Sequence, residues 1–151
     1  MELVQKIKDS SNFLEGMTTL RQLSFGLLDM SWHGGKSPQT ITSVKEFEKE
    51  AFAGTSLFPD VAENCMSTAF SHIFQGGYSS GYYSYKWAEV LDADAFEYFK
   101  EAGIFNKEVA TKFKENVLSK GGTEKPMTLY KKFRNKEPNA NALLKRAGLL
   151  K

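Results

Sequence analysis

The sequence predicts an all-α fold: an irregular multi-helix domain arranged around a loop rich in glycine and tyrosine. Apolar residues recur mainly every three or four positions, which is the period of a helix with one buried face. Runs with the two-residue period of a β-strand are almost absent. Glycine pairs and prolines separate the helical segments, as is typical of breaks between helices.

The chain length and composition indicate one ordinary globular domain. The 151 residues are enough for a single core, and we expect one helical domain over residues 1–151. Hydrophobic residues make up 41% of the chain and charged residues 25%, which is usual for a soluble protein. The formal net charge of +2 is too small to indicate a nucleic-acid or membrane-surface partner, so we expect neither.

Two helices are predicted at the N-terminal end. The first covers residues 3–14 and is amphipathic, and Gly16 is expected to interrupt the chain after it. The second covers residues 18–30, where leucines recur at helical spacing. Paired glycines and a proline in residues 32–38 are predicted to end it, which would place His33 in a surface loop or turn.

Capping signals predict the next two helices. Ser43 and Glu46 have the spacing of a capping box, in which a hydroxyl and a carboxylate bond to the first turn of a helix. This helix is predicted over residues 44–53. Asp60 is expected to cap a following helix that approaches His72.

The strongest helical pattern covers residues 83–102. Tyr83, Trp87, Leu91 and Ala95 step by four along one face, which predicts that this face is buried in the core. Three more helices are predicted, each with a capping or terminating residue: Asn106 before a helix to residue 119, Pro126 in the first turn of a helix to residue 133, and Gly148 after a helix over residues 139–147.

Four sequence features bear on partners and location. The basic cluster at residues 131–136 is interpreted as a solvated helix end rather than a phosphate site, because no wider basic face is evident. Cys65 is the only cysteine, which fits a reducing compartment. The chain also starts without an apolar signal segment and contains no run of about 20 apolar residues. We expect a cytoplasmic protein.

Residues 74–87 contain most of the tyrosines of the chain. Four of the six tyrosines lie here, at positions 78, 82, 83 and 85, among three glycines, and His72 is just upstream. Glycine permits close backbone approach, and tyrosine supplies a ring face and a phenol donor. This pattern suits a loop lying along a polar ligand. A tight turn with aromatics packed in the core explains it as well, and buried aromatics are common.

Simple catalytic and metal motifs receive little support. Residues 77–81 match the G-x-S-x-G nucleophile elbow, but that motif needs a strand before it, and both histidines precede Ser79. We therefore reject Ser79 as a nucleophile. The sequence has no H-E-x-x-H, no C-x-x-C and no closely spaced histidine pair, so no metal is expected in this chain. From the residues alone, a structural role for His72 is slightly favoured.

Four segments carry a resemblance to a known family: FSHIFQGGYSSGYYSYKWAE at 70–89, GIFN at 103–106, LSKGG at 118–122 and FRNKEP at 133–138. Through them, from about residue 3 to residue 149, the chain resembles the C-terminal region of the thimet oligopeptidase and peptidyl-dipeptidase family of zinc metallopeptidases. The spacing around the glycine pair resembles bacterial peptidyl-dipeptidases more than animal thimet oligopeptidase.

The resemblance implies a mostly helical enzyme that hydrolyses short peptides with one Zn²⁺. The family binds zinc through two histidines of an H-E-x-x-H helix and a later glutamate, and all of these would lie upstream of Met1. The chain is therefore expected to be a C-terminal fragment that lacks zinc and is inactive alone. Its expected partners are a short peptide substrate and the missing N-terminal part of the enzyme.

The resemblance also assigns roles to individual residues. His72, Tyr82 and Tyr85 are the candidates for stabilising the transition state, with Tyr82 or Tyr85 as the phenol donor. The substrate-binding candidates are the loop residues Gly76, Gly77 and Tyr78. Tyr83 and Trp87 are expected in the core. A non-catalytic peptide-binding or interaction module remains the alternative.

Overall fold

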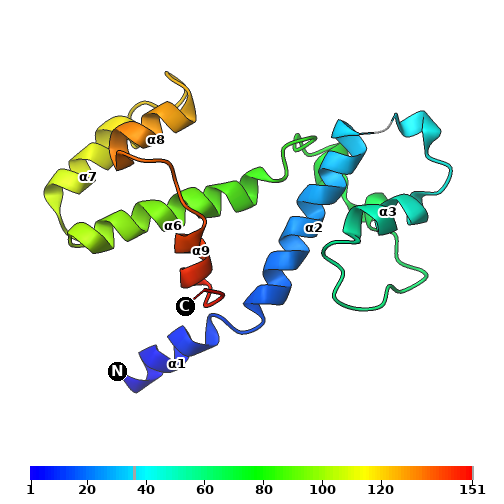
Figure 1. Ribbon diagram of the computed structural model, residues 1–151, viewed down its shortest axis with the longest axis horizontal. Helices are drawn as coiled ribbons and strands as arrows, with labels where there is room; N and C mark the ends of the chain where they lie inside the picture. The colour runs from blue at the N-terminus through cyan, green and yellow to red at the C-terminus, as the bar shows by residue number, and fades with distance from the viewer. Residues whose placement is uncertain (36, 151) are drawn as a thin grey trace. The chain divides into compact units, whose positions relative to one another are not determined.

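The computed structural model describes residues 1–35 and 37–150 (Figure 1). Every regular element in these two ranges is helical and no β-strand occurs in them, which confirms the predicted all-α fold. The chain divides into two compact units, Met1–Trp87 and Ala88–Lys151. The expectation of one domain over the whole chain stays a prediction. Lys36, which falls in the segment predicted to end the second helix, lies outside the described residues.

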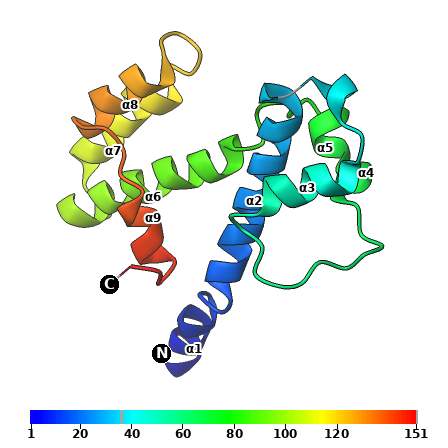
Figure 2. The same cartoon turned by 45° about the vertical axis from the view of Figure 1, so that its right-hand side comes forward.

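Unit 1 is built around the long helix α2, and α3 lies against it (Figures 1 and 2). The unit contains α1 (Glu2–Ser10), α2 (Glu15–Gly34), the 3₁₀ turn η1 (Pro38–Thr40), α3 (Val44–Phe52), α4 (Met66–Ala69), α5 (Ser71–Phe74) and the start of α6 (Ser84–Ala102). Its buried core consists of Leu28, Phe47, Phe70 and Ile73.

The boundaries of α1 and α2 correct three predictions. Helix α1 ends at Ser10 and not at residue 14, and the break covers residues 11–14, ending at Leu14 with a left-handed φ of 56°. Gly16 is inside α2. Helix α2 also continues to Gly34, so His33 lies in its last turn and not in a loop. A hydrogen bond of 2.8 Å joins His33 Nδ1 to Asp29 Oδ1 one turn earlier, and this contact supports the extra turn.

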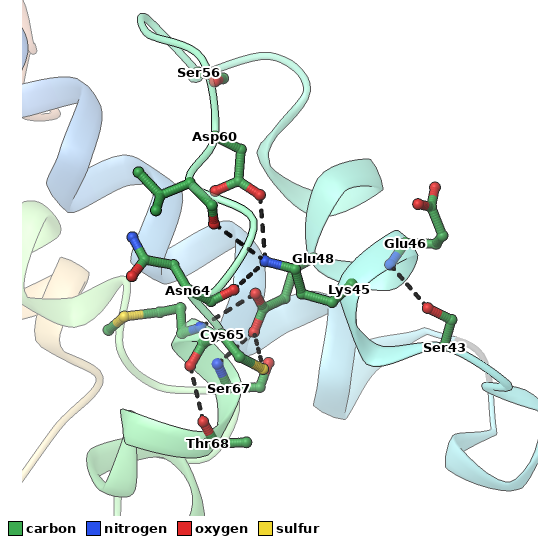
Figure 3. A network of polar contacts seen from close by, with 12 residues as sticks. Ser43, Lys45, Glu46, Glu48, Ser56, Asp60, Asn64, Cys65, Ser67 and Thr68 are labelled. Carbon is green, nitrogen blue, oxygen red and sulfur yellow. Dashed lines mark hydrogen bonds and ion pairs between the residues drawn. The ribbon is translucent and has the colours of Figure 1, made fainter.

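The helix predicted from Asp60 toward His72 is wrong, and Lys45 of α3 gives one reason (Figure 3). Lys45 Nζ donates to the backbone oxygens of Val61 and Asn64, which a continuous helix would use for its own bonds. Asp60 caps no helix and instead lies 3.4 Å from the same ammonium group. Residues 61–65 are consequently turns and loop.

Glu48 of α3 gives the second reason, because it fixes where the next helix begins. Its carboxylate accepts the N–H of Met66 at 3.1 Å and the N–H of Ser67, the first groups of α4 (Figure 3). Burial opposes the charged form of Glu48, but hydrogen bonds from Ser67, Met66 and Cys65 outweigh it and hold its pKa below the ordinary value. Phe70 then separates α4 from α5.

Unit 2 contains most of α6, then α7 (Lys107–Phe113), a π-helical extension η2 (Lys114–Leu118), α8 (Pro126–Arg134) and α9 (Asn141–Arg146). Helices α7, η2 and α8 contact one another. The buried core of this unit consists of Ala95, Val109, Tyr130 and Phe133.

The caps predicted at Ser43 and Asn106 are confirmed, unlike the one predicted at Asp60. The hydroxyl of Ser43 accepts the N–H of Glu46 at 3.3 Å. Asn106 Oδ1 accepts the N–H groups of Glu108 and Val109 at 2.9 and 3.2 Å, which starts α7. Pro126 stands in the first turn of α8. Glycines follow α6, η2 and α9 with positive φ: Gly103, Gly122 and Gly148.

The predicted core face of α6 is buried only in its later part. Ala95 is buried and Leu91 packs against the same core, as predicted. Tyr83 and Trp87 are 56% and 44% exposed, so their core assignment is wrong. The α8 side chain Tyr130 reaches α6 at Leu91, through a 3.3 Å hydrogen bond to its carbonyl oxygen, one turn beyond Trp87.

The basic cluster at residues 131–136 is not wholly solvated. Arg134 is buried, and its Nε lies 3.2 Å from Asp94 while its terminal nitrogens lie 3.3 Å from Glu101. Its guanidinium group also stacks 4.7 Å from the ring centroid of Tyr98. The interpretation as a solvated helix end is therefore wrong for Arg134, whose charge is used within the unit.

No helix in the described ranges has both the length and the apolar character needed to cross a lipid bilayer. The cytoplasmic location stays a prediction.

Candidate functional site

The side chains predicted to bind and act on substrate meet in unit 1, at the end of α5 and the start of α6. Their ring centroids lie 6.0 Å apart for His72 and Tyr78, and 6.4 Å apart for His72 and Tyr82. Tyr85 lies 5.2 Å from Tyr78 and 5.1 Å from Tyr82. We call Tyr78, Tyr82 and Tyr85 the tyrosine cluster. Together with His72, the cluster brings three phenols and one imidazole close together.

Tyr82 connects the tyrosine cluster to the core. Its ring makes edge contacts with Phe70 at 4.9 Å and with Phe25 of α2 at 5.9 Å. Both phenylalanines belong to the packing of unit 1. Aromatic edge contacts of this kind restrict ring orientation, so Tyr82 is the best fixed of the three tyrosines.

Tyr78 and Tyr85 form a stacked pair, with an interplanar angle of 24°. A hydrogen bond with the Tyr78 side chain is the largest cause that raises the pKa of Tyr85, followed by desolvation and by the charges of Tyr78 and Tyr82. Tyrosine is protonated at neutral pH even at its ordinary pKa, so this shift leaves the protonation state of Tyr85 unchanged there. The side chain of Tyr85 is 43% exposed.

A glycine turn brings Tyr78 back over His72. The N–H groups of Gly76 and Tyr78 donate to the carbonyl oxygen of His72 at 3.2 and 3.3 Å. A Cβ atom on Gly76 would lie 2.9 Å from His72 Cα and from that oxygen, so only glycine fits without a shift. Gly77 has φ of +77°, which also favours glycine.

Ser79 has a structural partner in this turn. Its hydroxyl donates to the carbonyl oxygen of the buried Ile73 at 2.5 Å. The hydroxyl therefore links the loop to α5. This contact adds a structural reason to the rejection of Ser79 as a nucleophile.

Sequence reasoning missed Asp29, the residue of α2 that holds the loop. Asp29 is completely buried. Its carboxylate accepts the N–H of Ser80 and the N–H of Tyr82, each at 2.9 Å, and contacts His33 Nδ1 at 2.8 Å. The available signal was an acidic residue inside the apolar Leu27-Leu28-Asp29-Met30 run, since a buried acid needs partners.

Helix α2 approaches the loop closely at a second point. A Cβ atom on Gly26 would lie 3.6 Å from the Cα of Tyr83, which is ordinary contact distance. The ring of His33 lies 5.6 Å from that of Phe74, at the end of α5. Gly26, Asp29 and His33 recur at three- and four-residue spacing, so they lie on one face of α2. This face supports the loop that carries the tyrosine cluster.

Metal ligands do not gather in the described part of the chain. No group of three or more His, Cys, Asp or Glu side chains lies there in an arrangement that could hold a metal ion. The ring contacts of His72 are with Phe70, Tyr78 and Tyr82, and the imidazole of His33 pairs with a single carboxylate. The site therefore offers hydrogen-bond donors and aromatic faces.

Comparison with known proteins places these features in a family. The profile of Peptidase family M3 matches residues 1–149. Oligopeptidase A of Escherichia coli is 43% identical over 148 residues, which cover 98% of this chain and 22% of that protein. Dipeptidyl carboxypeptidase of Escherichia coli is 36% identical over 149 residues, covering 98% of this chain and 22% of that protein.

A third relative is more distant. Thimet-like oligopeptidase of Dictyostelium discoideum is 30% identical over 148 residues, covering 98% of this chain and 22% of its own length. The chain thus spans less than a quarter of these curated relatives. Oligopeptidase A is more similar to it than dipeptidyl carboxypeptidase is, so the narrower expectation of a peptidyl-dipeptidase stays a prediction.

Proposed function

This chain belongs to peptidase family M3, and from that premise we propose that it is the part of a zinc-dependent oligopeptidase that binds short peptides and stabilises the transition state. The observation that carries the proposal is the gathering of His72 and the tyrosine cluster around one glycine turn. The rest of the peptidase would complete the active site.

Peptide hydrolysis needs donors of the kind that this cluster offers. When the scissile carbonyl carbon is attacked, its oxygen gains negative charge, and a donor at about 2.7–3.1 Å stabilises it. Tyr82 is proposed as the first phenol donor because its ring is fixed by Phe25 and Phe70. Tyr85 is the second candidate, because its ring lies 5.1 Å from that of Tyr82 and its side chain is 43% exposed. His72 would add an imidazole donor.

The glycine turn is proposed to cover the bound peptide. Gly76 and Gly77 shape the turn, and Tyr78 follows it, half-buried against Tyr85 and His72. An extended peptide presents side chains on alternate sides, so a loop with exposed aromatic faces suits it. Tyr78 would then contact substrate without taking part in bond breaking.

The zinc that the family implies does not fit the described residues, because they hold no cluster of metal ligands. We therefore assign no metal ligand to them. Hydrolysis is proposed to require the part of the peptidase that this chain does not span, and the isolated chain is proposed to be inactive.

The exposed apolar face of α1 and α2 supports that requirement. No residue of α1 is buried, and Leu3, Val4 and Ile7 are 70%, 52% and 61% exposed. Leu23 and Leu27 of α2 are also exposed. Apolar patches of this kind usually mark interfaces. We propose that the remaining part of the peptidase covers this apolar face.

Hydroxyl removal in a full-length family member that contains this segment tests the assignment. Tyr82→Phe is expected to lower kcat about 100-fold or more with little change in KM, as for the loss of one transition-state donor. Tyr85→Phe is expected to have a smaller effect in the same direction. Tyr83→Phe is the matched control, because Tyr83 lies outside the cluster. Wild-type kcat in both Tyr82→Phe and Tyr85→Phe would overturn the proposal.

A further inference from the structure

We propose that Asp29 is a positioning residue for the substrate-binding loop, and that it sets the place of the Tyr82 phenol. Asp29 is the one completely buried carboxylate among the described residues, and the proposed function assigns it no role. The inference rests on the proposed function, because the place of a phenol matters to the reaction only if the phenol acts on substrate.

Both oxygens of the carboxylate are used to hold the loop. Oδ1 accepts the N–H of Ser80 and Oδ2 accepts the N–H of Tyr82, each at 2.9 Å. Hydrogen bonds to a charged acceptor are stronger than neutral ones. Two bonds to residues two positions apart fix the backbone between them, and therefore the direction in which Tyr82 leaves the chain.

The loop needs this support because its backbone is strained. Ser80 has φ of 56°, a left-handed conformation that non-glycine residues adopt rarely. Such conformations persist where surrounding contacts enforce them, and they concentrate at functional sites. The bond from Ser80 to Asp29 is the contact that the structure provides at this residue.

The carboxylate is itself held in place by α2. His33 Nδ1 lies 2.8 Å from Asp29 Oδ1, on the next turn of the helix. Three residues before Asp29, Gly26 lets the backbone of Tyr83 approach to contact distance. The loop thus contacts α2 at two positions, Asp29 and Gly26. Support from a helix is the arrangement expected for a binding site.

The Tyr82 ring transmits this placement to its hydroxyl. The edge contacts with Phe25 and Phe70 hold the ring only for the observed backbone position, so a shift of the Tyr82 backbone changes these contacts and moves the phenol relative to Tyr85 and to any bound carbonyl oxygen. Misplacing a reacting or stabilising group by about 1 Å can lower a rate about 100-fold. Loss of Asp29 is therefore expected to reduce catalysis through Tyr82.

The test uses Asp29→Asn in a full-length M3 peptidase that contains this segment. The amide keeps the size of the side chain but replaces one acceptor oxygen with a donor. We expect kcat to fall at least about tenfold with KM within about twofold, and hydrogen exchange at the Ser80 and Tyr82 amides to quicken. In a Tyr82→Phe background, Asp29→Asn should lower kcat less than about twofold further, since both changes act through one phenol.

Glu48→Gln is the matched control. Glu48 is also a buried acid that accepts backbone N–H groups, but its partners are Met66 and Ser67, which do not belong to the tyrosine cluster. It is expected to lower stability and leave kcat near the wild-type value. An equal fall of kcat in Asp29→Asn and Glu48→Gln would show a general structural effect and overturn the inference. The inference is also overturned if Asp29→Asn lowers kcat as much in the Tyr82→Phe background as it does in the wild type.

The two proposals fail in distinguishable ways. If Tyr82→Phe lowers kcat and Asp29→Asn does not, the positioning inference alone is wrong. If Tyr82→Phe keeps wild-type kcat, the proposed role of Tyr82 fails, and the positioning inference fails with it. Should Asp29→Asn not fold, Asp29→Glu decides, because it keeps the carboxylate but displaces it by one methylene. Unchanged kcat in that variant would overturn the inference.

Discussion

The carboxylate of Asp29 accepts the backbone N–H of Tyr82 at 2.9 Å across 53 positions of sequence. This bond joins the middle of α2 to the loop that leads into α6. It makes the geometry of the tyrosine cluster depend on a helix that contributes no side chain to the cluster. Substitution of Asp29 is therefore expected to alter the loop, whereas substitution of Leu28 on the same helix would disturb the core of unit 1.

Gly76→Ala is expected to destabilise unit 1 and displace Tyr78. The new Cβ would meet His72 Cα and the His72 carbonyl oxygen at 2.9 Å, and backbone atoms cannot move aside as a flexible side chain can. Overpacking of this kind typically costs about 1–3 kcal/mol. Urea unfolding of wild type and variant measures the difference.

Gly54→Ala is the control for that experiment, because a Cβ there would meet nothing within 4 Å. Its stability should stay within about 0.5 kcal/mol of wild type. Equal stability of Gly76→Ala and Gly54→Ala would contradict the tight turn around His72.

The elements that the sequence predicted well are those stabilised by local signals. Asn106 caps α7, Pro126 starts α8 and Gly103 follows α6, because each acts within one turn of its own position. The gathering of His72 with the tyrosines also follows from nearness in sequence, since a glycine turn of a few residues joins them. Their roles toward substrate remain predictions.

The errors arise where distant contacts override local pattern. Residues 60–72 have helical spacing, yet Lys45 and Glu48 of α3 bind backbone groups there and leave only short helices. Asp29 had no recognisable motif, because its partners are backbone N–H groups of residues far along the chain. A pattern search finds side-chain types, and it does not reveal which backbone groups a buried acid will meet.

Glu48 is expected to make the stability of unit 1 fall in acid. Its pKa in the folded protein lies below its ordinary value of 4.5, so the folded state binds fewer protons than the unfolded state in this range. The stabilisation is fully present above about pH 4.5 and is lost as the pH falls through the lowered pKa. Glu48→Gln should show a shallower loss of unfolding free energy over the same range.

High salt separates Glu48 from a surface acid. Hydrogen bonding by Lys132 lowers the pKa of Glu124, but that pair lies at the surface, where salt screens it. In about 0.5 M NaCl the contribution of Glu124 should fade, and the contribution of the buried Glu48 should persist. Equal salt sensitivity of Glu48→Gln and Glu124→Gln would contradict the buried capping role.

Arg134→Met is expected to destabilise unit 2 strongly. The guanidinium group pairs with Asp94 and Glu101 and stacks on Tyr98, and its removal leaves the buried carboxylate of Asp94 without its cation. Breaking a buried ion pair from one side costs about 3–5 kcal/mol. Arg134→Lys should also be destabilising, since lysine cannot reproduce the planar contacts.

Lys132→Met is the control on the same helix, because Lys132 forms a surface pair with Glu124. Exposed pairs contribute about 0–1 kcal/mol, so this variant should unfold close to wild type. Comparable losses in the two methionine variants would show that Arg134 acts only as a surface cation, as the sequence pattern first indicated.

The 151-residue chain is expected to hydrolyse short peptides only after association with the rest of an M3 peptidase. Expressed alone it should show no turnover of a fluorogenic peptide, with or without added zinc, because the described residues hold no metal-ligand cluster. Co-expression with the remaining part as a separate polypeptide should restore turnover. Turnover by the purified chain alone that a chelator removes would contradict this.

Ile7→Glu tests whether the apolar face of α1 makes that association. Ile7 is 61% exposed, so a charge there should leave the unfolding free energy of the isolated chain nearly unchanged while opposing burial against a partner. Gln5→Glu places the same charge at a polar position of the same helix. Restored activity should fall at least about tenfold for Ile7→Glu at limiting concentration and little for Gln5→Glu. If both variants complement equally, α1 is not the interface, and the exposed apolar side chains of α2 become the next surface to test.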